Sequence, residues 1–525
     1  MSRGTVTPPD GGRTVPRTPA TAGAGMQGSL LRAAPLTVVL LVAGFLRFWR
    51  LTDTGLNSDE AVYTGTAASL SGDSELGALF PVFRAHPVLF QSVLSLALRV
   101  HPGDWTARAV PAAIGVVTVA LTYVLGRRLY GHRAGLVGAL LLAVMPYHVV
   151  VSRQVLLDGP MTLGTTATLY CVVRYAESPA PRRSGGGGRS AGHLLAAGGA
   201  LGLAVLAKET SAVLLGSLYA FFALTPAVRM RAGYLLPALA AFGAVVLAHP
   251  LSQQLAGHRS ASGSYLLWQM FRPANHPLTF YAVEVPSAVG VLVLVAGFGG
   301  LVWLRRENTW RERLLLCWIA VPLLFFTVWP VKGFQYLLPA APVFAVLAGR
   351  TLAALHLDAR GRARRSLAVL VACTVAGSLA APAWAKTAPP TGTRFLAGSG
   401  GLPGGREAGQ WVRGHAPQGA RLLAIGPSMA NVVQFYGRRP VSALSVSSDP
   451  HRRNPSYRAV PNPDRAMRDG RFQYVVWDAY TARRTPFFTR KATTLVERYH
   501  GREVFTARDG EGRALVVVFQ VRGAS

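Results

Sequence analysis

The feature that most constrains this chain is a series of apolar runs, most of them about 15 to 20 residues long and almost free of charge. Buried helices of soluble proteins are rarely apolar over such a length, whereas a helix needs about 20 apolar residues to cross a bilayer. Half of the 525 residues are hydrophobic and only 15% are charged, against about a quarter in a typical soluble chain. A soluble enzyme is therefore excluded. Disorder is excluded for most of the chain as well, because disordered segments have low hydrophobicity.

The apolar runs predict about eleven transmembrane helices. The first run, roughly 30–46, follows Arg residues as a signal sequence does, but no small-residue cleavage site comes after it, so we expect an uncleaved anchor. The other ten runs lie near 106–126, 134–152, 159–176, 193–207, 210–227, 232–249, 286–304, 314–330, 335–352 and 366–384.

The segment between His86 and Val100 decides the topology. It has only 15 residues, and Ser92, Ser95 and Arg99 recur on one side of it, which favours an interfacial helix over a spanning one. With this segment on the surface and the N-terminus inside, five Arg clusters all lie in the cytoplasm, as the positive-inside rule requires. As a span, the segment would move every cluster outside. The clusters are Arg127/Arg128/Arg133, Arg182/Arg183/Arg189, Arg229/Arg231, Arg305/Arg306/Arg311/Arg313 and Arg360/Arg362/Arg364/Arg365.

The charge balance is strongly basic, with 54 Lys and Arg residues against 23 Asp and Glu residues. In a soluble protein this excess would suggest nucleic-acid binding. Here the Arg residues gather at the ends of apolar runs, where membrane proteins use them to set orientation. We therefore expect membrane lipids, and no nucleic acid, around this chain. The three Cys residues each fall inside an apolar run and build neither a disulfide framework nor a metal cluster.

Composition divides the chain into three parts. Residues 1–28 predict a disordered cytoplasmic tail. Residues 29–385 form the membrane part, whose outer loop 51–105 carries interfacial helices. Residues 386–525 change to short apolar strands between helical or loop patterns, which is typical of a small α/β domain. The strands are expected near 421–425, 472–477 and 514–520. The predicted fold class is an α-helical polytopic membrane protein with a small C-terminal α/β extracytoplasmic domain.

Asp59 and Glu60 are the first candidates for chemistry, directly after the first span. Ser58 is able to cap a short helix, and the two acidic residues would then stabilise its first turn. Alternatively, a carboxylate at the membrane surface accepts a proton from an incoming hydroxyl. The local sequence leaves both interpretations open.

Asp158 is the second candidate, in a short outer turn that ends at Pro160. Because Pro suits the first turn of a helix, Asp158 could be an N-cap. A lone carboxylate between two apolar spans is more costly to keep than a capping Ser, which favours a functional role.

Lysine is rare in this chain, yet two of its four Lys residues, Lys208 and Lys332, lie at outer span ends. Lys208 is either a snorkelling side chain with Glu209 as its neighbour or a phosphate ligand. An ammonium group is a compact charge suited to phosphate oxygens, so the pair suggests a lipid-borne phosphate.

The two long outer loops supply further candidates. Arg84 and His86 precede the interfacial helix. Aromatic residues in the 250–285 loop anchor it at the interface or stack on sugar rings. The His residues show no metal-ligand spacing, so no metal site is predicted. The loop residues are Tyr265, Trp268, Arg272, His276 and Tyr281.

Five stretches, taken in order, resemble the polyprenyl-phosphate-dependent glycosyltransferases of the GT-C superfamily, specifically the group of aminoarabinose transferases and protein O-mannosyltransferases. The resemblance covers roughly residues 30–385. The stretches are Leu56–Tyr63, Ala107–Pro111 through Leu125–Gly131, Ser152–Pro160, Gly202–Lys208 and Tyr336–Pro339.

The resemblance implies a GT-C-like fold whose active site opens outward. It implies that Asp59 contributes to catalysis, that Asp158 lies at the same site, and that Lys208 contacts the carrier phosphate. Together with Glu60 from the local sequence, the predicted catalytic residues are Asp59, Asp158 and Glu60. The family often places a Lys before the Pro of the interfacial helix, where this chain has His86. Either protonated His86 substitutes for that Lys, or Arg84 or Lys332 supplies the charge, or phosphate binding is weaker. The candidates for substrate binding are Tyr63, Arg153, Arg272, His276 and Tyr281.

We therefore expect a multi-pass plasma-membrane enzyme that moves a sugar from a polyprenyl phosphate to a lipid, glycan or protein acceptor on the outer face, by inverting single displacement. A divalent cation is compatible with this chemistry but not demanded, because cationic side chains supply the same stabilisation. The main alternative is a lipid or sugar transporter. Transporters place ionisable groups near the midplane and often have repeated halves, and the sequence shows neither. A non-catalytic membrane-anchored scaffold is the third interpretation.

Overall fold

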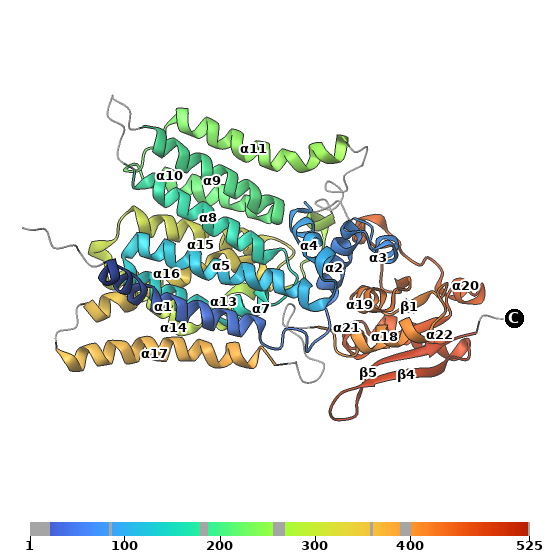
Figure 1. Ribbon diagram of the computed structural model, residues 1–525. Helices are drawn as coiled ribbons and strands as arrows, with labels where there is room; N and C mark the ends of the chain where they lie inside the picture. Colours follow the sequence, from blue (N-terminus) through green and yellow to red (C-terminus); the bar gives the residue numbers. More distant parts are fainter. Residues whose placement is uncertain are drawn as a thin grey trace, which may run out of the picture.

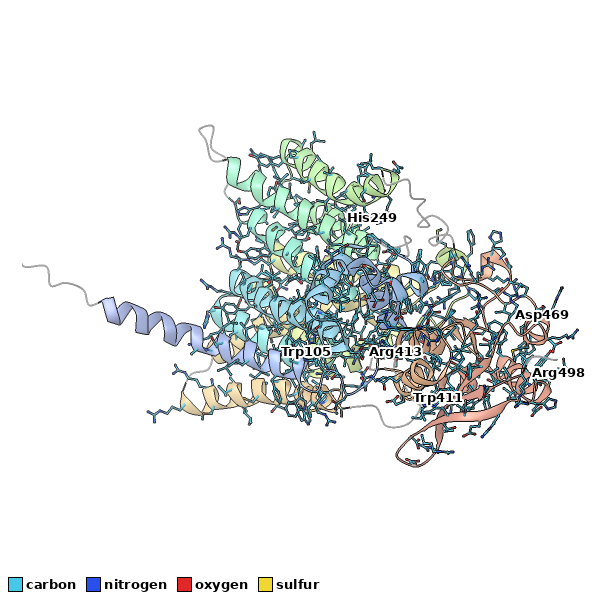
Figure 2. The ribbon with its side chains drawn as sticks, turned by 45° about the vertical axis from the view of Figure 1, so that its right-hand side comes forward. Trp105, His249, Trp411, Arg413, Asp469 and Arg498 are labelled. Atoms are coloured by element: carbon cyan, nitrogen blue, oxygen red, sulfur yellow. The ribbon has the colours of Figure 1, made fainter. Side chains whose placement is uncertain are left out.

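A bundle of long helices and a small α/β domain make up the chain in this computed structural model (Figure 1). The structure describes residues 22–82, 87–178, 187–255, 268–357, 361–388 and 401–522. The helices of the bundle run roughly parallel to one another, and the α/β domain lies at one end of them (Figure 1). Asp469 and Arg498 lie on the side of this domain that faces away from the bundle (Figure 2).

A helix, or two consecutive helices, covers each of the eleven apolar runs. Among the described residues, five helices are long and apolar enough to cross a membrane, or seven if the bent pairs α6–α7 and α13–α14 each form one span. The count of eleven spans therefore stays a prediction. The elements are α1 (Ala22–Phe48), α5 (Asp104–Tyr130), α6 (His132–Val144), α7 (Pro146–Ser152), α8 (Asp158–Ala176), α9 (Gly187–Ala207), η1 (Glu209–Val213), α10 (Leu214–Leu224), α11 (Ala232–Leu255), α13 (Phe280–Val289), α14 (Val291–Trp303), η2 (Arg305–Glu307), α15 (Trp310–Val328), η3 (Phe334–Ala340), α16 (Ala341–Leu357) and α17 (Arg362–Ala385).

Helix α1 begins at Ala22, inside the range 1–28 that was predicted to be disordered. The last residues of that range are therefore helical, and the rest of the range lies outside the described residues.

Three short helices cover the end of the bundle that faces the α/β domain: α2 (Ser58–Ser71), α3 (Ser74–Leu79) and α4 (Leu89–Val100). Helix α4 has 12 residues, too few to span a bilayer. Its buried face carries Leu94, while Val93 and Val100 on another face are exposed. An apolar helix of this length with an exposed apolar face suits the predicted interfacial position.

The α/β domain contains one mixed five-stranded sheet in the order β2-β1-β3-β5-β4. Strands β2, β1 and β3 are parallel, whereas β5 pairs antiparallel with both β3 and β4. Each of the three predicted strands is present. The elements are α18 (Gly405–His415), β1 (Leu422–Ala424), α19 (Pro427–Gly437), β2 (Val441–Ala443), η4 (Pro450–Arg452), α20 (Pro463–Arg468), β3 (Tyr474–Asp478), α21 (Ala479–Arg484), α22 (Pro486–Arg498), β4 (Arg502–Arg508) and β5 (Ala514–Gln520).

Helix α19 docks the α/β domain on α2, α3 and the loop before them. The backbones touch as well, because a Cβ added to Gly401 would lie 1.9 Å from the Gly55 carbonyl oxygen. Several polar contacts accompany this close approach and hold the α/β domain against the end of the bundle. The contacts are Asn431 Nδ2 to Ser58 Oγ at 3.0 Å, Gln434 Nε2 to the Leu79 carbonyl at 3.0 Å, the Leu56 amide to Tyr436 Oη at 2.9 Å, Tyr436 Oη to Asp104 Oδ2 at 2.5 Å, and Arg438 to Asp73 at 2.8 Å and Glu75 at 2.9 Å.

Asp478 makes the stability of this domain pH-dependent. Its side chain is fully buried at the end of β3, where Oδ1 accepts the Thr481 amide at 2.7 Å. Its other oxygen has no hydrogen-bond partner among the described residues. Burial raises the pKa of Asp478 from 3.8 to about 6. Between these values the folded domain holds a proton that the unfolded chain has lost, so stability falls as pH rises from about 4 to 6.

We therefore expect Asp478→Asn to stabilise the domain at pH 7 by up to about 3 kcal/mol, and to have little effect at pH 4. Asn keeps the cap on Thr481 but cannot ionise. Pulse proteolysis of the full-length, detergent-solubilised protein in urea measures the difference. An equal effect at both pH values would contradict this account.

Candidate active site

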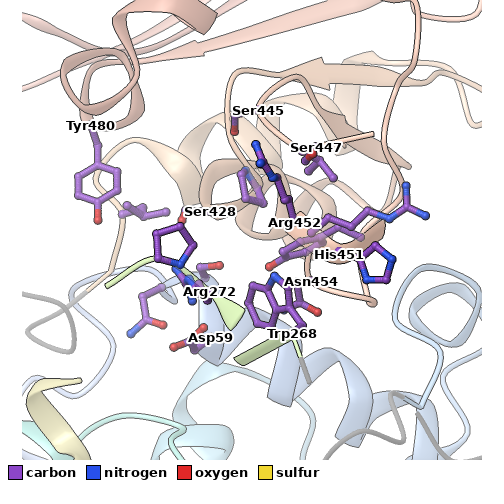
Figure 3. A pocket seen from close by; sticks show the side chains of 18 of the residues that line it. Asp59, Trp268, Arg272, Ser428, Ser445, Ser447, His451, Arg452, Asn454 and Tyr480 are labelled. Atoms are coloured by element: carbon purple, nitrogen blue, oxygen red, sulfur yellow. The ribbon is translucent and has the colours of Figure 1, made fainter. Parts of the chain in front are cut away.

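Asp59 lies at the floor of a large cavity between the bundle and the α/β domain (Figure 3). Asn57, rather than Ser58, is the N-cap of α2, and it forms a capping box with Glu60. This turns the Glu60 side chain back towards the cap and leaves the Asp59 carboxylate exposed. The cavity has a volume of about 860 Å³. Trp268 and Arg272 line it next to Asp59, and loops of the α/β domain close its other side (Figure 3).

A buried ion pair, Asp158–Lys208, lies close to this floor. Asp158 begins α8 and Lys208 follows the end of α9, so two helix ends bring the side chains together at 2.7 Å. The Lys208 ammonium also lies 4.7 Å from the centre of the Tyr336 ring. The charge of Asp59 interacts electrostatically with both Asp158 and Tyr336. The structure therefore brings Asp59, Asp158 and Lys208 to one end of the bundle.

Glu60, predicted to be catalytic, is placed as a structural residue instead. It is fully buried and bonds through both carboxylate oxygens to Arg108, each at 2.7 Å. It also accepts the Val155 amide at 3.0 Å. The prediction for Glu60 is not supported, because it does not line the cavity and every oxygen is already engaged. Arg108, which the sequence did not single out, ties α5 to α2.

Breaking this pair is expected to cost much stability. Glu60→Ala leaves the Arg108 guanidinium buried without its counter-charge, which typically costs 3–5 kcal/mol. The matched control is Glu75→Ala, because the Glu75 side chain is 57% exposed and its pair with Arg438 lies at the surface. Such surface pairs are worth about 1 kcal/mol or less. Thermal unfolding of the full-length protein in detergent compares the two, and equal losses would contradict the structural role.

The predicted substrate-binding residues separate into two groups. Arg272 lines the cavity and lies over the Trp268 ring at 5.0 Å. The other four do not line it. Tyr63 packs among apolar side chains of both the bundle and the outer helices. The Arg153 guanidinium donates to the carbonyls that end α1, including Leu46 at 2.9 Å and Trp49 at 2.8 Å. The His276 ring stacks on Phe280 with a centroid distance of 4.2 Å, and the Tyr281 hydroxyl donates to the Gly333 carbonyl at 3.0 Å.

Of the remaining phosphate-binding candidates, the structure describes only Lys332. Lys332 is buried and donates to the Trp329 carbonyl at 3.0 Å. Arg84 and His86 lie outside the described residues.

Sequence reasoning missed the wall of the cavity that the α/β domain contributes. Several of its residues follow the carboxyl ends of the parallel strands, where open α/β sheets usually bind ligands. That rule could have found them only if the strand order had been known. Ser428 follows β1, Ser445 and Ser447 follow β2, and Tyr480 follows β3 (Figure 3). Within the described ranges, no group of three or more His, Cys, Asp or Glu side chains is arranged to hold a metal ion.

One known protein family matches part of this sequence, and several solved structures have a similar fold. The family described as dolichyl-phosphate-mannose-protein mannosyltransferase matches residues 85–253, which include Asp158 and Lys208 but not Asp59. No curated protein matches the sequence.

Several solved structures share the fold across most of the chain. ArnT from Cupriavidus metallidurans in the apo state is 16% identical with a TM-score of 0.65, and the match covers 94% of this chain and 98% of that one. The same protein bound to undecaprenyl phosphate is 17% identical with a TM-score of 0.64, covering 93% and 98%. The Archaeoglobus fulgidus oligosaccharyltransferase tethered with an acceptor peptide is 14% identical with a TM-score of 0.60, covering 95% and 75%. The chain thus has the fold of the GT-C glycosyltransferases, and the resemblance that its five sequence stretches indicate is confirmed.

Proposed function

We propose that this protein is a membrane glycosyltransferase that moves a sugar from a polyprenyl phosphate to an acceptor on the outer face of the plasma membrane. The observation that carries the proposal is the exposed Asp59 carboxylate beside the buried Asp158–Lys208 pair, at the end of a GT-C bundle. A similar fold has been solved with undecaprenyl phosphate bound, which supports a lipid-phosphate donor.

The proposed reaction is a single displacement. The acceptor hydroxyl oxygen attacks the anomeric carbon of the sugar, and Asp59 takes the hydroxyl proton. The bond between the anomeric carbon and the phosphate oxygen breaks, and the electron pair stays on the lipid phosphate. Lys208 stabilises the charge that grows on this phosphate. The configuration at the anomeric carbon is inverted.

Asp158 has a supporting part in this scheme. Its 2.7 Å contact with Lys208 gives the buried ammonium group a counter-charge, and an unpaired cation would be costly in this setting. The Tyr336 ring, 4.7 Å from the ammonium nitrogen, adds a second favourable contact for the cation. Lys208 is therefore held in place before a phosphate arrives.

The fold gives no support to the alternative of a transporter. Asp59, Asp158 and Lys208 lie at helix ends, whereas transporters usually place their ionisable sites near the bilayer midplane.

Cells that carry or lack this protein test the proposal. Loss of one glycosylated lipid, glycan or protein from the cell surface, restored by the wild type and not by Asp59→Asn, is the expected result. The glycosidic configuration of the restored product should be opposite to that of the donor. Identical surface glycans and membrane lipids with and without the protein would overturn the proposal.

A further inference from the structure

A second cavity of about 600 Å³ adjoins the first and follows the edge of the sheet. Strand β2 is the edge strand, and all three of its residues, Val441–Ala443, line this cavity. Helices α2 and α3 and the segment 456–461 form its other walls. The two cavities share Pro427, Val446 and Tyr457 as lining residues, so they are neighbours with a common wall.

Tyr457 divides the two cavities close to the candidate catalytic residue. Its hydroxyl accepts a hydrogen bond from Asn431 Nδ2 at 3.1 Å, and the same amide group donates to Ser58 Oγ at 3.0 Å. Ser58 immediately precedes Asp59, and Tyr457 also interacts electrostatically with Asp59. The second cavity therefore begins about one side chain away from the proposed base.

Three arginines give the second cavity its charge: Arg421 before β1, Arg471 before β3 and Arg458 in the segment opposite them. All three are exposed, and no carboxylate in the described parts of the chain forms an ion pair with them. Elsewhere in the same domain, arginines do have such partners, as in Arg498–Asp464 at 2.7 Å. No acidic side chain is among the residues described as lining this cavity.

Arg421 and Arg471 lie away from the entrance that Tyr457 marks, whereas Arg458 directly follows Tyr457 in the chain. Arg421 and Arg471 stand at the amino ends of β1 and β3, whereas Val446 and Pro427, on the shared wall, follow the carboxyl ends of β2 and β1. A three-residue strand is roughly 10 Å long. A ligand that reaches from Asp59 past Arg458 to Arg421 and Arg471 must therefore be extended.

We propose that this cavity is a second acceptor subsite, in which Arg421, Arg458 and Arg471 bind a negatively charged group, phosphate or carboxylate, of an extended acceptor whose reacting hydroxyl lies beside Asp59. This inference rests on the proposed function, and it adds a class of acceptor: one that carries an anionic group roughly 10 Å or more from the glycosylated hydroxyl. Arginine suits this task because its guanidinium binds both anions through paired hydrogen bonds.

The test measures binding of three probes to the full-length protein in nanodiscs at low ionic strength: tripolyphosphate, trigalacturonate and the uncharged maltotriose. The test variant is R421Q/R458Q/R471Q. The control variant, R490Q/R502Q/R522Q, removes the same charge from exposed arginines of the same domain that line neither cavity. The wild type should bind at least one anion more tightly than maltotriose, and the tighter of the two identifies the anionic group.

The test variant should lose about tenfold or more of this affinity, while the control should change by about twofold at most. Both should bind undecaprenyl phosphate like the wild type, because the Lys208 site is untouched. Equal losses in both variants, no preference for anions, or a parallel loss of undecaprenyl phosphate binding would overturn the subsite.

The two proposals fail in different ways. Transfer by the wild type together with anion binding that does not depend on the three arginines would reject the subsite alone. Arginine-dependent anion binding in a protein that transfers no sugar would reject the proposed function.

Discussion

Replacing Asp59 with Asn is expected to lower the rate of sugar transfer by about 10²–10⁴-fold, the usual contribution of a general base. Asn has nearly the same shape as Asp but cannot take the acceptor proton. Asp59 is exposed, and the capping box of α2 uses its neighbours Asn57 and Glu60, so the helix should fold normally. The measurement is transfer from a polyprenyl-phosphate sugar by the purified protein in proteoliposomes.

Asp53→Asn is the matched control for this change. Asp53 lies six positions earlier in the same loop, is exposed, and pairs with Arg50 rather than facing the large cavity. Its transfer rate should stay near that of the wild type. Undecaprenyl phosphate binding by D59N should also be unchanged, which separates loss of the base from loss of the donor site. Transfer by D59N at the wild-type rate would remove Asp59 from the mechanism.

Replacing Lys208 with Met is expected to lower transfer by about 10²–10³-fold, as removal of one preorganised charge at an oxyanion typically does. Affinity for undecaprenyl phosphate should fall in parallel. The single change also leaves Asp158 buried without its partner, since the two groups bond at 2.7 Å, so part of the loss would come from altered folding. Binding and transfer by the purified variant give the two readouts.

Two further variants separate charge from folding. K208M/D158N removes both charges and should recover the stability that K208M loses, but not its transfer. Lys491→Met is the control for the substitution itself, because Lys491 lies in α22 and lines neither large cavity. If K208M/D158N recovers transfer together with stability, Lys208 has only a structural role.

The helices were predictable from the sequence because their signals are local. Apolar runs marked where each long helix of the bundle lies, and the alternation of turns and short apolar stretches marked β1, β3 and β5. The number of spans was not settled by the same signals. In α8 the buried threonines lower the hydropathy, and their hydroxyls donate to backbone carbonyls, as Thr162 does to Asp158 at 2.7 Å.

The structure brings together Asp59, Asp158 and Lys208, which stand at helix ends, but their roles stay predictions. The assignment of Asp59 and Glu60 to one role did not anticipate Arg108, which is 48 positions beyond Glu60 and withdraws it into an ion pair. Placing the cap at Ser58 instead of Asn57 also hid the different roles of the two carboxylates. The capping box of Asn57 holds Glu60 and not Asp59. The wall of the cavity from the α/β domain depends on strand order and on a contact between residues 373 positions apart, Ser58 and Asn431, which no local pattern encodes.

The docking of α19 on α2 has a consequence for biogenesis. The residues that contact α2, α3 and the loop before them, from Gly401 to Arg438, are synthesised after every helix of the bundle. Asp59 is therefore synthesised long before the residues that surround it, and contacts this far apart in sequence form late. The candidate site is completed only when the α/β domain has been synthesised and has folded, so a polypeptide truncated or stalled before that point carries an unfinished site.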